Sequence, residues 1–153
     1  MALDAAGNQA QTPEEGRPSG TAWKVLLLLF TGNLLNFFDR VIPSIVVEPL
    51  KAEFGLSDAD IGYLAAAFTV IYAVFGIPLG ILADRGTRKK IMGWGLAAWS
   101  LLTAATAGAT GFMSLLLIRL GVGIGEASFA PAANSMLADL YPAEKRSRAT
   151  GLM

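Results

Sequence analysis

Cysteine and histidine are both absent from this chain of 153 residues. Without cysteine there is no disulfide, no thiolate nucleophile and no thiolate metal ligand. Without histidine, a proton-linked step near neutral pH requires a carboxyl group whose pKa is raised. The net charge is zero, which gives no support for a nucleic-acid partner, and no segment fits the phosphate-binding pattern GxxxxGK[ST]. We also find no nucleophile–base pair or metal constellation, so we expect no enzyme activity, no cofactor and no metal site.

Charged residues are scarce, at 16% of the chain against 54% hydrophobic residues, and the mean hydropathy is +0.52. The apolar residues gather in four segments, each long enough for the roughly 20 residues that a membrane crossing needs. These segments predict an all-α membrane protein with helices over residues 23–50, 59–83, 91–110 and 112–140. The run 147–153 resembles the start of a fifth helix, and residues 1–20 are expected to form a disordered cytosolic tail.

Lysine and arginine are distributed unevenly between the two ends of the predicted helices. Nine of the 12 fall on one side if the four segments alternate in direction, and on the other side the loop 51–58 holds only Lys51. The positive-inside rule then places the N-terminus in the cytoplasm.

Four charged residues lie inside the apolar segments, where a charge costs at least ~2.5–3.5 kcal/mol on insertion scales. They are Asp39, Arg40, Arg119 and Glu126. Asp39 lies roughly 24 Å along its helix from one end and Arg119 roughly 10 Å along its helix from the other end, so the two share a depth. Arg119 and Glu126 are seven residues apart and share a helix face. Such residues usually line a substrate or ion path, and the alternative is ion pairing that only orients helices.

Two polar turns carry recognisable motifs. The first, from Gly80 to Lys90, reads GILADRGTRKK and resembles the major facilitator signature G-x-L-x-D-R-x-G-R-[RK], with Thr87 in place of the usual glycine. The second, Asp139 to Arg146, fits the pattern D/E-x-x-P-x-x-x-R that the same superfamily carries after its fourth helix. The resemblance implies a cytosolic network that latches one conformation, formed by Gly80, Asp84, Arg85, Arg88, Asp139 and Arg146. Because an acidic group opposes the dipole at a helix C-terminus, Asp84 is expected to meet a cation or a helix N-terminus.

The intramembrane charges narrow the resemblance to the spinster-like branch of the superfamily. The segments that carry it are Asn36 to Arg40 (NFFDR), Arg119 to Ala127 (RLGVGIGEA) and the pair Pro131–Ala132. Eukaryotic members of this branch export sphingosine-phosphate or lysophospholipids. The resemblance implies that Asp39 and Glu126 serve proton or ion coupling. Arg119 would hold an anionic group, with Arg40 and Asn36 beside it, although Asn36 could equally bridge two helices.

Glycines also occur in pairs spaced by four residues inside the apolar segments. Gly121 and Gly125 form one pair, and Gly76 and Gly80 form another. Such small-xxx-small pairs let two membrane helices approach closely.

The sequence thus predicts the N-terminal portion of a secondary transporter that works by alternating access in a bacterial inner or plasma membrane. Its expected partners are the bilayer, a small amphiphilic or lipid-like substrate, protons and a C-terminal half that forms the opposite wall of the cavity. The alternative is a self-contained four-helix protein, either an oligomeric exporter or a membrane interaction subunit that does not transport.

Overall fold

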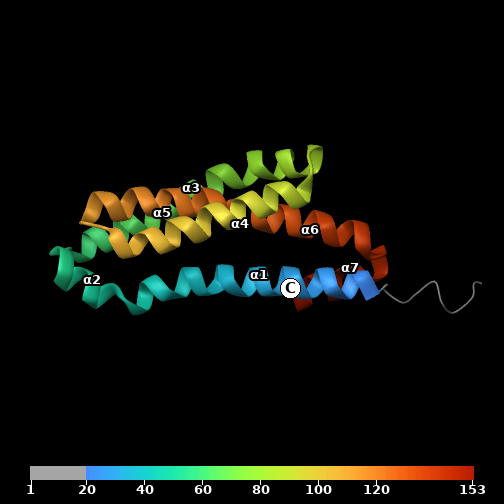
Figure 1. The fold of residues 1–153 in the computed structure, drawn as a ribbon, viewed down its shortest axis with the longest axis horizontal. Helices are drawn as coiled ribbons and strands as arrows, with labels where there is room; N and C mark the ends of the chain where they lie inside the picture. Colours follow the sequence, from blue (N-terminus) through green and yellow to red (C-terminus); the bar gives the residue numbers. More distant parts are fainter. Residues whose placement is uncertain (1–19) are drawn as a thin grey trace, which may run out of the picture.

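The computed structural model describes residues 20–153, and this part of the chain is helical without a strand (Figure 1). The helices are α1 (Gly20–Ile45), α2 (Val47–Phe54), α3 (Asp58–Arg85), α4 (Arg88–Ala105), the short 3₁₀ helix η1 (Thr106–Gly108), α5 (Phe112–Ala127), α6 (Phe129–Leu140) and α7 (Ala143–Leu152). Four stretches are long and apolar enough to cross a membrane: α1, α3, α4 with η1, and α5 with α6. The prediction of an all-α fold with four membrane-spanning helices is therefore confirmed. The tail predicted over residues 1–20 lies outside the described residues, except for Gly20 at the start of α1.

The stretch predicted as one helix over residues 23–50 is divided in two. α1 ends at Ile45, and α2 begins at Val47 after a bend at Val46. Pro43 precedes this bend, and a proline has no N–H to continue the helical hydrogen bonds. α2 ends at Gly55, which has a φ of 63° that favours glycine.

Lys51 fastens α2 to the start of α3. Its Nζ lies 2.8 Å from Oδ1 of Asp58 and 3.3 Å from Oε1 of Glu48. These two hydrogen bonds raise the pKa of Lys51 above its ordinary value, and the bond to Asp58 has the larger effect. On the other side of α2, an apolar cluster of Leu56, Leu64 and Leu115 packs against Leu50 and Phe54, so the helix lies flat against the end of the bundle.

The stretch predicted as one helix over residues 112–140 is interrupted at Ser128. The Ser128 hydroxyl donates to the Gly125 carbonyl oxygen at 2.7 Å, a local bond that competes with the helical pattern. Pro131 follows, and its ring nitrogen offers no hydrogen for the carbonyl of Ala127. This break places Glu126 at the end of α5, directly before the bend.

Glycines let α4 and α5 pack at very short range. A Cβ built on Gly95 would lie 1.9 Å from Ser128 Oγ, and one on Gly125 would lie 2.9 Å from Trp99 Cβ. Gly121 similarly accommodates Leu102. The prediction that Gly121 and Gly125 permit close packing is confirmed. For the other predicted pair, Gly80 touches Pro131 at an ordinary 3.4 Å and Gly76 has no neighbour within 4 Å, so that pair does not mark a close helix crossing.

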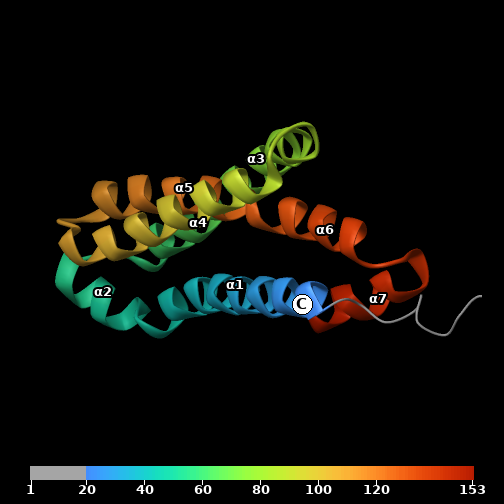
Figure 2. The same ribbon diagram turned by 45° about the vertical axis from the view of Figure 1, so that its right-hand side comes forward.

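α1 runs along one side of the layer formed by α3, α4 and α5, with α6 and α7 at one end and α2 at the other (Figures 1 and 2). A buried cluster joins α1 to α4 and α6, and Trp99 and Phe129 meet in it edge to face at 5.8 Å between ring centroids. Gly32 of α1 lies against the Phe129 ring, and the Tyr141 hydroxyl donates to the Ala22 carbonyl oxygen at 3.2 Å. α1 is therefore anchored mainly at the α6–α7 end of the bundle.

Candidate functional site

An ion pair joins α1 to α5 inside the bundle. Arg40 Nε donates to Oε2 of Glu126 at 3.0 Å. The Glu126 side chain has no exposed surface, whereas the Arg40 side chain keeps 39% of its surface exposed. The carboxylate is therefore the deeply buried partner, and the guanidinium reaches it from a more open position.

Two aromatic rings of α3 lie under the Arg40 guanidinium. Its Cζ is 4.4 Å from the centroid of the Tyr72 ring and 5.7 Å from that of Phe68. The two rings stack on each other, with centroids 6.1 Å apart and planes inclined by 23°. Both cation–ring distances fall within the range of an attractive cation–π contact. Arg40 thus has a carboxylate on α5 and a pair of π faces on α3.

The second oxygen of Glu126, Oε1, is buried without a hydrogen-bond partner among the described residues. Asn36 on α1 is buried nearby and interacts with the same carboxyl group, but its amide makes no hydrogen bond of normal geometry to Oε1. A buried carboxylate oxygen with no donor is costly, because its full desolvation penalty remains. The geometry therefore leaves one oxygen of this carboxyl group free to accept a proton or a donor from a ligand.

Asp39 on α1 and Arg119 on α5 lie close enough to interact electrostatically. They form no ion pair within 4.0 Å in residues 20–153, where Arg40–Glu126 is the pair that joins these two helices. Asp39 also interacts with the indole of Trp99, a side chain on α4 that is only 1% exposed.

The structure thus gathers all four of the predicted intramembrane charges, together with Asn36, at one place between α1 and α5. It also adds Phe68, Tyr72 and Trp99, which sequence reasoning missed. Phe68 and Tyr72 are four residues apart, so they share a helix face, but an apolar helix contains many such pairs and nothing in the sequence marks this one.

Two of the predicted latch residues pair with each other, and a third meets a partner that was not predicted. Arg88 at the start of α4 forms an ion pair with Asp139 of α6. Asp84 accepts a hydrogen bond from the Ser135 hydroxyl of α6 at 3.0 Å, rather than meeting the predicted cation or helix N-terminus. Ser135 lies one turn before Asp139 on the same face of α6, so this face supplies both the neutral donor to Asp84 and the partner of Arg88. α3, α4 and α6 are therefore joined at this end by two polar contacts.

Arg146 closes the C-terminal end of α6. Its guanidinium donates to the carbonyl oxygens of Ala138 at 2.7 Å and Tyr141 at 3.0 Å. A cation at the end of a helix satisfies carbonyls that have no helical partner and complements the dipole. Its role in this structure is that of a cap, and it does not touch the other latch residues.

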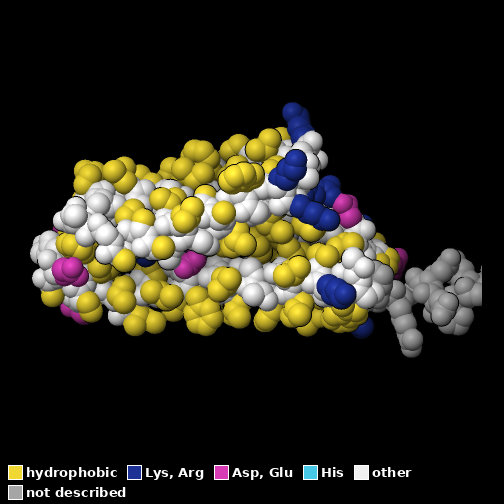
Figure 3. All heavy atoms as spheres, in the orientation of Figure 1, with side chains coloured by type: hydrophobic (Ala, Val, Ile, Leu, Met, Phe, Trp, Pro, Cys, Tyr) yellow, Lys and Arg dark blue, Asp and Glu magenta, His cyan; other side chains and the backbone are white. Residues whose placement is uncertain are grey.

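The turn between α3 and α4 forms without the glycine that the motif usually carries at position 87. Gly86 and Thr87 are extended, with φ of −112° and −81°, so neither backbone conformation is restricted to glycine. Gly80 lies about one and a half turns before the end of α3 and packs against Pro131. Arg85 is exposed at the end of this helix. Lysine and arginine side chains gather around this turn and α7, while the middle of the molecule is largely apolar (Figure 3). We call this part of the molecule the basic end.

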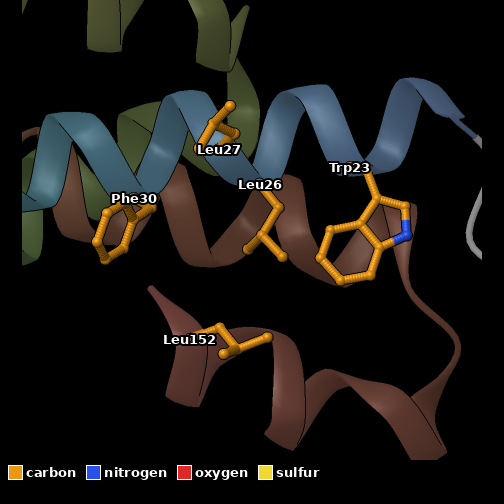
Figure 4. Close-up of a pocket in the computed structure, with 5 residues that line it drawn as sticks. All are labelled: Trp23, Leu26, Leu27, Phe30 and Leu152. Atoms are coloured by element: carbon orange, nitrogen blue, oxygen red, sulfur yellow. The ribbon is translucent and has the colours of Figure 1, made fainter.

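A separate apolar groove lies between α1 and α7. It is lined by Trp23, Leu26, Leu27, Phe30 and Leu152, and Trp23, Leu26 and Phe30 point from α1 toward Leu152 (Figure 4). None of these side chains is charged, so the groove is distinct from the charged site farther along α1.

The fold and this charged site define an integral membrane protein that crosses the bilayer several times. Residues 29–153 match the family model of the Major Facilitator Superfamily. The chain belongs to this superfamily.

Among solved structures, the chain resembles a bacterial homologue of the human lysosomal transporter Spinster in its inward-facing, unoccupied conformation. The TM-score is 0.84 with 41% sequence identity, over 88% of this chain and 28% of that chain. The human protein spinster homolog 1 is 36% identical over 135 residues, which cover 87% of this chain and 26% of that protein. The resemblance to the spinster-like branch is therefore confirmed.

Transporters named for other solutes match equally well. Probable anion transporter 1 of rice, a chloroplastic protein, is 36% identical over 152 residues, which cover 98% of this chain and 28% of that protein. The chain thus spans between 26% and 28% of the length of these relatives. The matched relatives are transporters and not enzymes.

Proposed function

We propose that this chain forms the N-terminal part of a secondary active transporter that moves an amphiphilic, lipid-like solute by alternating access, coupled to protons. The N-terminus lies in the cytoplasm of a bacterial cell, and the helices that relatives carry beyond this region supply the opposite wall of the substrate cavity. The observation that carries the proposal is Glu126: its side chain is fully buried, one oxygen is paired with Arg40, and the other makes no hydrogen bond of normal geometry within residues 20–153.

The four charges have distinct roles in this proposal. Asp39 and Glu126 are the groups that take up and release the proton, because they are the acidic residues beside Arg40 and Arg119. Arg119 has no ion-pair partner within 4.0 Å among residues 20–153, which leaves its guanidinium available for a carboxylate or an anionic head group. Arg40 supports the ionised form of Glu126, and Asn36 lines the same site.

The latch at the basic end supplies the conformational part of the proposal. Asp84, Arg88 and Asp139 join α3, α4 and α6 through Ser135 and through the Arg88–Asp139 pair. In this proposal Arg146 holds the end of α6 that carries Asp139, Gly80 packs against Pro131 of α6, and Arg85 adds positive charge at the exposed end of α3. Contacts of this kind hold one arrangement of the helices until the transport cycle breaks them.

The experiment measures solute accumulation driven by a pH gradient in proteoliposomes that contain the full-length protein. Asp39→Asn and Glu126→Gln are each expected to abolish accumulation while substrate binding is retained, because an amide cannot take up and release the proton. Glu53→Gln is the matched control, since this carboxylate is exposed at the α2 end, outside the charged site. Wild-type accumulation by both variants would exclude proton coupling through these residues.

A second candidate substrate class is a small organic anion without an apolar part, favoured by the match to the rice anion transporter over nearly the whole chain. The same proteoliposomes distinguish the two classes. A lysophospholipid and a small dicarboxylate are offered in parallel, and Arg119→Ala is expected to impair whichever solute is transported.

A further inference from the structure

The cation of the buried ion pair has two kinds of partner, and only one of them can change its charge. Glu126 can be neutralised by a proton, whereas the rings of Phe68 and Tyr72 attract a guanidinium at any pH of interest. The distances from Arg40 are 3.0 Å to the carboxylate and 4.4 Å to the centroid of the Tyr72 ring. Arg40 is therefore held by both partners at once in this structure.

The packing of α3 against α5 explains why these two partners meet at one guanidinium. A Cβ on Gly123 would lie 3.2 Å from the carbonyl oxygen of Phe68 and 3.4 Å from its ring. The backbones of α3 and α5 can approach this closely only because Gly123 has no side chain. Gly123 and Glu126 are three residues apart and share a helix face, so the same contact brings the aromatic pair beside the carboxylate.

We infer that the aromatic pair Phe68–Tyr72 is a second binding site for the Arg40 guanidinium, which keeps this cation in place when Glu126 is neutral. The inference rests on the proposed role of Glu126 as a proton-binding group. Tyr72 is then a positioning residue, because it acts on the carboxyl group only through Arg40. An unpaired arginine in a membrane-spanning bundle is costly, and a cation–π contact offsets part of that cost.

The first test measures thermal stability of the full-length protein in detergent. Tyr72→Leu is expected to lower the melting temperature more in a Glu126→Gln background than in the wild type, because the rings are then the remaining partners of Arg40. Tyr72→Phe keeps the π face and is expected to restore most of the loss in both backgrounds. Tyr63→Leu is the matched control, since Tyr63 lies on the same helix with 66% of its surface exposed.

The second test measures the initial transport rate across a range of pH. The defect of Tyr72→Leu is expected to grow as the pH falls, reaching about tenfold where Glu126 is protonated. Phe68→Leu alters the more distant ring and is expected to give a smaller defect that also grows as the pH falls. This variant replaces Tyr72→Leu in the test if Tyr72→Leu does not fold. A protein whose aromatic pair only fills space would show a defect independent of pH and no rescue by Tyr72→Phe.

The two tests separate this inference from the proposed function. Additive stability effects of Tyr72→Leu and Glu126→Gln, or a Tyr72→Phe protein as impaired as Tyr72→Leu, would overturn the aromatic site. More-than-additive stability effects together with a transport defect that is equal at every pH would retain the aromatic site and reject protonation of Glu126.

Discussion

At the scale of single residues, the asymmetry of the Arg40–Glu126 pair decides which substitution is most harmful. The carboxylate is fully buried, while the guanidinium has two aromatic neighbours and some exposed surface. Removing the cation leaves the buried carboxylate without its ion-pair partner, whereas removing the carboxylate leaves the cation with its rings.

We therefore expect Arg40→Met to destabilise the folded protein by about 3–5 kcal/mol, the cost of breaking a buried ion pair from one side. Glu126→Gln is expected to cost less, and the double variant Arg40→Met/Glu126→Gln is expected to recover most of the loss. Thermal unfolding in detergent measures all three. Lys51→Met is the control, because it breaks an exposed pair that contributes little. A double variant less stable than Arg40→Met alone would contradict this account.

At the scale of helices, the interruption between α5 and α6 positions the charged site. α5 and α6 together form one membrane crossing, yet they meet at Ser128, next to Glu126 and opposite Gly95. Discontinuous helices near a binding site are a recurring feature of secondary transporters. The contacts between α6 and the α3–α4 turn lie on the far side of this break, at the basic end.

These contacts predict the effect of Asp84→Asn in the full-length protein. The substitution weakens the hydrogen bond from Ser135, so the balance between inward-facing and outward-facing states is expected to shift, with little change in substrate affinity within one state. Distances between spin labels at the basic end measure the populations. Glu144→Gln, an exposed change on α7, provides the control. Unchanged populations in Asp84→Asn would remove this residue from the latch.

At the scale of the whole molecule, the charge distribution predicts the orientation in the membrane. The basic end carries the lysines and arginines of the α3–α4 turn and α7, whereas the α2 end has only Lys51, which is already paired with Glu48 and Asp58. The positive-inside rule therefore predicts that the basic end faces the cytoplasm.

Residues 1–153 contain no cysteine, so a single cysteine introduced here can be labelled once any cysteine elsewhere in the full-length protein has been replaced. In intact cells that express the full-length protein, Glu53→Cys at the α2 end is expected to react with a membrane-impermeant thiol reagent. Lys90→Cys at the basic end is expected to react only after permeabilisation, and the unchanged protein gives the background. Labelling of Lys90→Cys alone in intact cells would reverse the orientation.

The sequence by itself determined the membrane class, the four crossings and the set of charged residues that form the site. These follow from hydropathy and segment length, and from the rarity of charges inside apolar helices, which are local properties of the chain. It also determined the superfamily, because the motifs at Asp84 and Asp139 are short and contiguous.

The pairing within the site was decided only by the tertiary structure. Shared depth along the helices puts Asp39 level with Arg119, and these two interact electrostatically. Depth does not fix the rotation around the helix axes, however, and the ion pair formed is Arg40 with Glu126. The Ser135 donor to Asp84 and the Phe68–Tyr72 rings under Arg40 were hidden for the same reason. Each depends on how closely two helices approach, and that distance is set by glycines such as Gly95, Gly123 and Gly125 meeting particular side chains of another helix.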